Sequence, residues 1–268
     1  MERWLDIWEQ IAWGDGEATL YGLAAIAVLT VLEQVAPAEP GQGWRGRARN
    51  LVFLLLFKFF GLASLALWYA FLPRFPQPLI TPGSANALLL VVLYLLAIDL
   101  IYYGYHCAQH HFPALWALHE LHHSDAELDA TSSYQTYWLE APVQAIVVMT
   151  PALLIFGGLG PAHGHAVMMG SLFFLIFPHA NVRLEVGPLT GWLVGPQVHR
   201  VHHSRLPGHR DQNFVQYFSV LDRIFGSFYR PAPGEFPPTG VVEVGTDEAV
   251  GTMMVRPFRL WLDGLLGR

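Results

Sequence analysis

The chain has 268 residues, of which 53% are hydrophobic and only 13% are charged, compared with about 25% charged residues in an ordinary soluble domain. This composition favours a membrane protein with one domain and a short tail. The net charge of −6 argues against nucleic-acid binding, and the single cysteine, Cys107, excludes an intrachain disulfide.

Hydrophobic runs predict the helices that enter the bilayer, whose core takes about 20 apolar residues to cross. The segment before the first run is acidic, whereas a cleaved signal peptide starts with positive charge, so we expect a retained helix. The fourth and fifth runs predict either two spans or a re-entrant hairpin. The runs cover residues 18–35, 51–72, 86–105, 141–156 and 165–177.

The runs divide the chain into three parts. Residues 1–85 hold two membrane spans, and residues 86–230 hold the remaining spans and most of the histidines. Residues 231–268 form a proline-rich tail, whose end at 253–266 mixes arginine with large apolar residues and predicts an interfacial helix or a surface strap. The expected fold is an all-α integral membrane bundle with four spans, or five if the fifth run crosses.

Positive charges predict the orientation of the spans. Arg45, Arg47 and Arg49 follow the first span, so this loop should lie on the cytoplasmic side. The loop at 73–85 should then lie outside. Alternating passages bring both histidine-rich regions, 106–123 and 199–203, to the cytoplasmic face of a multi-pass protein.

The histidines predict a metal site. They occur in one H-x-x-x-H block and two H-x-x-H-H blocks, and residues four apart lie above one another on a helix, so each block can direct two or three imidazoles to one point. Imidazole suits iron, zinc, copper and nickel rather than magnesium or calcium. Eight imidazoles suit two ions, and His179 follows the fifth run on the same face. The predicted ligands are His106, His110, His119, His122, His123, His179, His199, His202 and His203.

Ligating histidines usually donate their second ring nitrogen to an acceptor. Asp99 lies seven residues before His106, and an acid within an apolar span is costly without such a role. Asp222, Glu120 and Asp125 are further candidates. We expect Cys107, His111, His163 and His165 to be packing or surface residues, and the sequence leaves His209 open.

The residues around the blocks resemble the fatty acid hydroxylase/sterol desaturase superfamily. LWALHELHHS at 115–124 resembles its second histidine block, and PQVHRVHHS at 196–204 resembles the third. His179-Ala180-Asn181 resembles the step between them, and Asn213 with 222–227 resembles the closing signature. The family usually has tryptophan where Leu221 stands, and arginine and histidine-proline near Gln135, Tyr137 and Trp138, which leaves the substrate type open.

The resemblance implies a four-helix membrane bundle with a cytosolic helical cap over a dinuclear, usually di-iron, centre. Asn181 joins Asp99 and Asp222 as expected supporting residues. The resemblance also implies an enzyme that uses O2 and two electrons from a cytochrome b5-like or ferredoxin-like donor. The expected reaction is hydroxylation or desaturation of a lipid, such as a fatty acyl chain or a sterol.

Two other functions use the same residues. A membrane zinc-dependent hydrolase would need an open metal position and a general base such as Glu120, although H-E-x-H-H is not the H-E-x-x-H of zinc proteases. A metal transport or storage protein would place its ligands near the middle of its spans, whereas these histidines lie at span ends.

Overall fold

The computed structural model describes residues 2–71, 86–157, 161–241 and 248–266. All regular elements in these ranges are helices, and the only bridges of extended chain described there are Pro37–Val182 and Ser204–Thr239. The prediction of an all-α fold is therefore confirmed for the described part of the chain. The predicted outer loop at 73–85 lies outside it.

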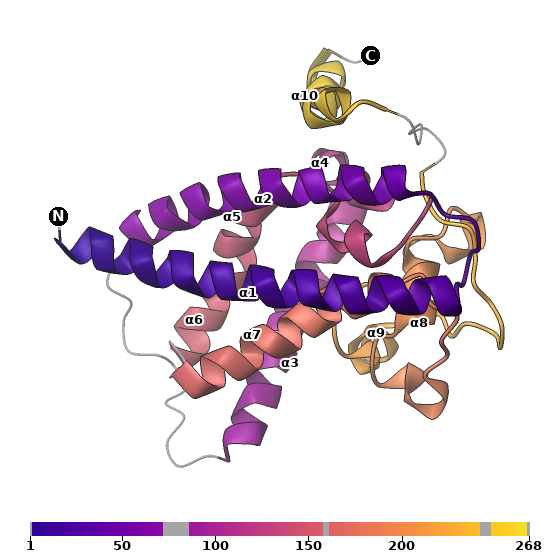
Figure 1. Ribbon diagram of the computed structural model, residues 1–268, viewed down its shortest axis with the longest axis horizontal. Coiled ribbons are helices and arrows are strands. Elements are labelled where there is room, and N and C mark those ends of the chain that lie inside the picture. Colours follow the sequence, from indigo (N-terminus) through magenta and orange to yellow (C-terminus); the bar gives the residue numbers. More distant parts are fainter. Residues whose placement is uncertain (1, 72–85, 158–160, 242–247, 267–268) are drawn as a thin grey trace.

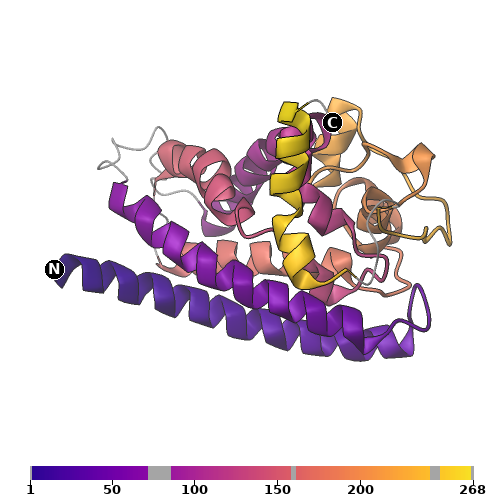
Figure 2. The same cartoon turned by 90° about the horizontal axis from the view of Figure 1, so that it is seen from above.

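An N-terminal hairpin of two long helices forms one side of the molecule. Helices α1 (Glu2–Val35) and α2 (Trp44–Phe71) run antiparallel and side by side (Figures 1 and 2). Leu55 and Phe59 on α2 are each 69% exposed, as suits a lipid-facing surface. Helix α2 begins seven residues before the predicted span, because its first turns hold arginines that pair with neighbouring segments.

Helix α3 (Ala87–His111) carries the first histidine block beyond the predicted end of its span. The Asn86 side chain caps its start by accepting the N–H groups of Leu88 and Leu89, and the helix ends where Phe112 becomes extended before Pro113. The 24-residue stretch Leu88–His111 and the 20-residue stretch Gly16–Val35 are the described stretches long and apolar enough to cross a bilayer.

The fourth and fifth predicted runs form shorter, less regular helices. Helix α5 (Glu140–Gln144), the π-helical turn η2 (Ala145–Met149) and helix α6 (Thr150–Phe156) are continuous, and α7 (Pro161–Ile176) follows. The two stretches rise only about 25 Å and 24 Å along their axes, against about 30 Å for the hydrocarbon core.

Short helices gather where α1 ends, α2 begins and α3 ends, and form a cap over the bundle (Figure 1). Helix α10 (Val250–Leu266) packs on α4 (Pro113–His123) through buried Met253, and the Trp261 indole N–H donates to the Ala114 carbonyl at 2.8 Å. It lies crosswise to α1 and α2 (Figures 1 and 2). The elements are α4 (Pro113–His123), η1 (Ala130–Tyr134), η3 (Phe177–His179), η4 (Gly187–Gly191), α8 (Pro196–His202), η5 (Pro207–His209), α9 (Ser219–Phe225) and α10 (Val250–Leu266).

Candidate metal centre

Helices α3 and α4 bring the first two histidine blocks face to face. The Nε2 atoms of His106 and His119 lie 2.9 Å apart, and those of His110 and His123 lie 3.2 Å apart. Helix α8 adds a fifth ring, that of His202, whose centroid is 4.6 Å from that of His106. The members of this first group have ligand atoms within 4.8 Å of one another: His106, His110, His119, His123 and His202.

A second group forms beside the first from α4, α8 and η3, the short helix that follows α7. His179 Nε2 lies 3.0 Å from His199 Nε2 and 3.2 Å from His122 Nε2, and His203 Nε2 lies 3.1 Å from His199 Nε2. The second group is His122, His179, His199 and His203. The structure thus gathers all nine predicted ligands, and none of the other four histidines belongs to either group.

Each block directs two of its rings, spaced four residues apart, to one group, and the third ring of each H-x-x-H-H block joins the other group. His119 and His123 join the first group, while His122 joins the second; His199 and His203 join the second, while His202 joins the first. Neighbouring residues on a helix diverge by about 100°, so His122 and His123 cannot face the same point. Each H-x-x-H-H block therefore contributes rings to both groups, whereas His106 and His110 both join the first.

Several rings are oriented through their Nδ1 atoms. His106 Nδ1 lies 2.6 Å from the Phe214 carbonyl oxygen, His202 Nδ1 lies 2.9 Å from that of Gln212, and His179 Nδ1 lies 2.8 Å from that of Leu175. A carbonyl only accepts, so each Nδ1 carries the proton and each Nε2 presents a lone pair to its group.

The donor set fits transition-metal ions. Burial, followed by repulsion between neighbouring rings, lowers the pKa of most cap histidines well below the ordinary value of about 6.5, and burial lowers the pKa of His122 to about 4. A lowered pKa favours the neutral form of these rings, and His202 Nε2 is buried without a hydrogen-bond partner among the described residues. Facing lone pairs repel unless a cation lies between them. The cap histidines whose pKa is lowered well below the ordinary value are His119, His123, His179, His199, His202 and His203.

An apolar cavity of about 630 Å³ reaches both groups from within the helical bundle. Its inner end is lined by His106, His119, His122, His179 and His199. Its walls come from successive turns of α3, α5–α6 and α7, and along α3 the lining runs from His106 back to Tyr94, about 18 Å of helix. The cavity has the length and polarity to hold an alkyl chain.

Comparison with known proteins agrees with this geometry. The sequence profile of the fatty acid hydroxylase family matches residues 91–227, half of the chain. The chain belongs to the fatty acid hydroxylase family.

Its relatives carry the names of lipid oxygenases. Alkylglycerol monooxygenase from Danio rerio is 28% identical over 166 residues, covering 62% of this chain and 34% of that protein. The human alkylglycerol monooxygenase is 29% identical over 168 residues, covering 62% and 36%. Ornithine lipid hydroxylase from Rhizobium tropici is 27% identical over 160 residues, covering 58% and 47%. The chain thus spans about a third to a half of these relatives, and no solved structure matches it.

Two carboxylates hold the backbone of residues 214–218, in a segment that runs beside the first group. Asp222 accepts the N–H groups of Phe214 and Val215, and Asp99 accepts those of residues 216–218. The same segment presents its carbonyls to His106 and His202. Asp211 and Asn213 hold left-handed backbone, with φ of 58° and 57°, and such strain persists only where the surroundings enforce it. Asp99 and Asp222 therefore fix the stretch of backbone whose carbonyls face His106 and His202.

The predicted supporting residues contact backbone groups and not the histidine rings themselves. Asp99 and Asp222 hold backbone rather than a ring nitrogen, and Asn181 binds the backbone of Glu39. Glu120, the candidate base, is held by Arg256 of α10 at 2.5 and 3.3 Å. The open case, His209, lies outside both groups and contacts Ser204 and Glu235.

Glu140 is the carboxylate that the sequence reading missed. It is 1% exposed, its Oε1 lies 3.1 Å from His119 Nδ1, and its Oε2 accepts hydrogen bonds from Gln109 and Gln144. Its only signal in the sequence is its position immediately before the fourth hydrophobic run. No histidine pattern connects it to α4, so its role depends on tertiary packing.

Replacing Glu140 with leucine should weaken the first metal position. Loss of an acceptor on a ligating histidine typically lowers metal affinity or activity about 10- to 100-fold. The fall would be measured by chelator competition, with Glu185→Gln, an exposed acid, as the control. Wild-type affinity in Glu140→Leu would show that the His119 contact does not support the site.

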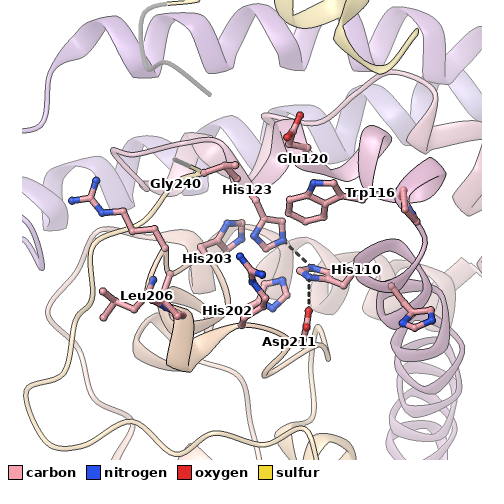
Figure 3. A pocket seen from close by; sticks show the side chains of 16 residues that line it. His110, Trp116, Glu120, His123, His202, His203, Leu206, Asp211 and Gly240 are labelled. Atoms are coloured by element: carbon pink, nitrogen blue, oxygen red, sulfur yellow. Dashed lines mark hydrogen bonds and ion pairs between the residues drawn. The ribbon is translucent and has the colours of Figure 1, made fainter. Parts of the chain in front are cut away.

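A second, more polar cavity of about 510 Å³ reaches the histidines by another route (Figure 3). It touches His110, His123, His202 and His203, none of which lines the apolar cavity. Asp211 lies at its wall, 3.5 Å from His110 Nδ1. The two cavities therefore approach the histidines through separate sets of rings.

Proposed function

We propose that this protein is a membrane-bound oxidoreductase that uses two histidine-held iron ions, O2 and two electrons to hydroxylate a lipid. The observation that carries the proposal is the apolar cavity whose inner end is lined by histidines of both groups. The family and the names of the lipid hydroxylases and monooxygenases that the chain resembles support it.

The residues of the two groups would hold the metal ions through their Nε2 atoms. Bound iron supplies the activation of oxygen that attack on an unreactive C–H bond requires, which side chains cannot provide. The protein contributes orientation, since Glu140 and the 212–214 carbonyls fix the rings, and the cavity aligns the chain of the lipid and excludes water. Alkylglycerols and ornithine lipids are the first substrates to test.

The membrane placement is part of the proposal. The stretches Gly16–Val35 and Leu88–His111, with α2, would cross the bilayer, and the short α5–α7 stretches suit a hairpin that enters and leaves by one face. The arginines after α1 would place both histidine groups on the cytoplasmic face. Helix α10 would lie in the interface, where Trp261 and its exposed leucines contact lipid.

The polar cavity would give electrons a path that does not compete with the lipid. A cytochrome b5-like or ferredoxin-like protein on the cytoplasmic side would approach His110 and His123 there, while the lipid occupies the other cavity. This separation suits an enzyme that must receive reductant while its substrate remains bound.

Elemental analysis of the purified protein tests the proposal. We expect about two iron ions per chain and lipid hydroxylation that stops when O2 is removed. Zinc in the purified protein would call for reconstitution with ferrous iron before the assay. Absence of any metal after iron-replete expression, or turnover that continues without O2, would contradict the proposed function.

A further inference from the structure

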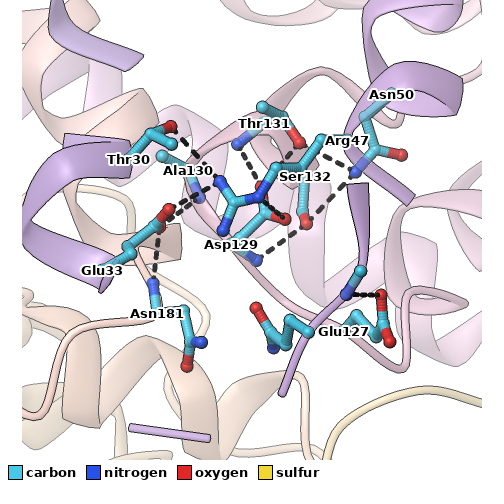
Figure 4. A network of polar contacts seen from close by, with 12 residues as sticks. Thr30, Glu33, Arg47, Asn50, Glu127, Asp129, Ala130, Thr131, Ser132 and Asn181 are labelled. Atoms are coloured by element: carbon cyan, nitrogen blue, oxygen red, sulfur yellow. Dashed lines mark hydrogen bonds and ion pairs between the residues drawn. The ribbon is translucent and has the colours of Figure 1, made fainter. Parts of the chain in front are cut away.

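The N-terminal hairpin lies outside the residues that the family profile matches, yet it contacts the segments that carry the second histidine group. Glu33, near the end of α1, is 2% exposed. Its Oε1 accepts the N–H groups of Ala130 and Asn181, both at 2.8 Å (Figure 4). One carboxylate thus ties the loop after α4 to the loop after His179.

Helix α2 holds that carboxylate in place. Arg47 donates to Glu33 Oε2 at 2.7 Å and lies 3.6 Å from Asp129, next to Ala130 (Figure 4). Both partners of the Glu33–Arg47 pair are buried. A buried pair of this kind fixes geometry, because removing either member leaves the other charge uncompensated.

The turn between α1 and α2 forms backbone hydrogen bonds with the loop after His179. The Ala38 N–H donates to the Asn181 carbonyl, and the Arg183 N–H donates to the Ala36 carbonyl. The Asn181 side chain completes the contact: its Oδ1 accepts the Glu39 N–H at 2.9 Å, and its Nδ2 donates to the Glu39 carbonyl at 2.8 Å. Asn181 follows His179 by only two residues, so the turn sets where His179 lies.

Arg200 connects the same turn to the third histidine block. It lies between His199 and His202 and is buried. Its guanidinium pairs with the Glu39 carboxylate, donates to the Pro237 carbonyl at 2.8 Å and reaches Asn181 Oδ1 at 3.4 Å. The turn therefore contacts segments that carry His179 and His199, two of the four members of the second group.

We propose that Glu33 and Asn181 are positioning residues for the second metal ion, and that the N-terminal hairpin maintains this position selectively. The first group is held by other contacts: Asp99 and Asp222 through the 214–218 segment, and Glu140 through His119. The inference rests on the proposed metal centre and assigns different supports to its two halves.

The test is the rate at which a chelator removes iron from the detergent-purified protein. Wild type should release its two ions in two phases, assigned with His110→Ala for the first group and His122→Ala for the second. In Glu33→Ala we expect the second-group phase to accelerate about 10- to 100-fold while the other phase is unchanged. Glu17→Ala, an exposed acid on the same helix, should leave both phases unchanged.

Asn181→Ala guards against a general loss of folding, because it keeps the Glu33–Arg47 pair. It should accelerate the same single phase, and Glu33→Gln, which keeps an acceptor for the two N–H groups, should have the smaller effect. Equal acceleration of both phases, or none in either alanine variant, would overturn the inference. A wild type without metal would instead defeat the proposed function on which the inference depends.

Discussion

Replacing His202 with alanine is expected to abolish lipid oxidation and to remove one metal ion, and replacing His122 with alanine is expected to remove the other. His202 belongs to the group of five rings and His122 to the group of four. Each variant deletes a proposed ligand, so the loss of activity should exceed the roughly 10- to 100-fold that a change outside the ligand set produces. The two variants therefore distinguish the two metal positions, although each residue is the middle histidine of an H-x-x-H-H block.

The measurement is metal per chain with turnover, for both variants and for His209→Ala. His209 is a buried histidine of the cap that lies outside both groups, so its loss controls for the removal of a cap imidazole. We expect about two ions in wild type and in His209→Ala, and about one in each of the other variants. Full activity in both His122→Ala and His202→Ala would sink the proposed site.

The pairing of histidines four residues apart was predictable because helical spacing is local information. H-x-x-x-H places His106 and His110 on one face, and this pair does join one group. Helical geometry also separates His122 from His123, but which group each ring joins was not predictable, since it depends on how α4, α8 and η3 meet. Glu140 was not predicted, because it reaches His119 only through a tertiary contact.

Hydrophobicity predicted the helices but misplaced some of their ends. The third predicted span stops at residue 105, whereas α3 continues to His111, because backbone hydrogen bonding continues after the side chains become polar. Asp99 was recognised as an acid that needs a role, but its partners, the N–H groups of 216–218, are distant in the chain. The composition of a span indicates that such an acid has a function, and only the fold identifies its contact.

A tryptophan at Met168 should change which lipids the enzyme accepts without changing its metal content. Met168 lines the apolar cavity on α7, 11 residues before His179, or about 16 Å along the helical path. The indole would shorten the far end of the cavity and leave the histidines untouched. Each methylene group kept out of the cavity costs about 0.8 kcal/mol, so excluding roughly four lowers kcat/KM for a long chain by about 3 kcal/mol, or about 200-fold.

The comparison uses a long-chain and a short-chain form of the same lipid, assayed with wild type, Met168→Trp and Phe173→Trp. Phe173 lies on the same helix but is 52% exposed and outside the cavity lining, so its tryptophan variant tests the substitution without the obstruction. Met168→Trp should lose the long chain, keep the short one and retain two metal ions. An equal loss for both chain lengths would mean that the lipid does not extend along α7, and the orientation inferred from the cavity would have to be reversed or abandoned.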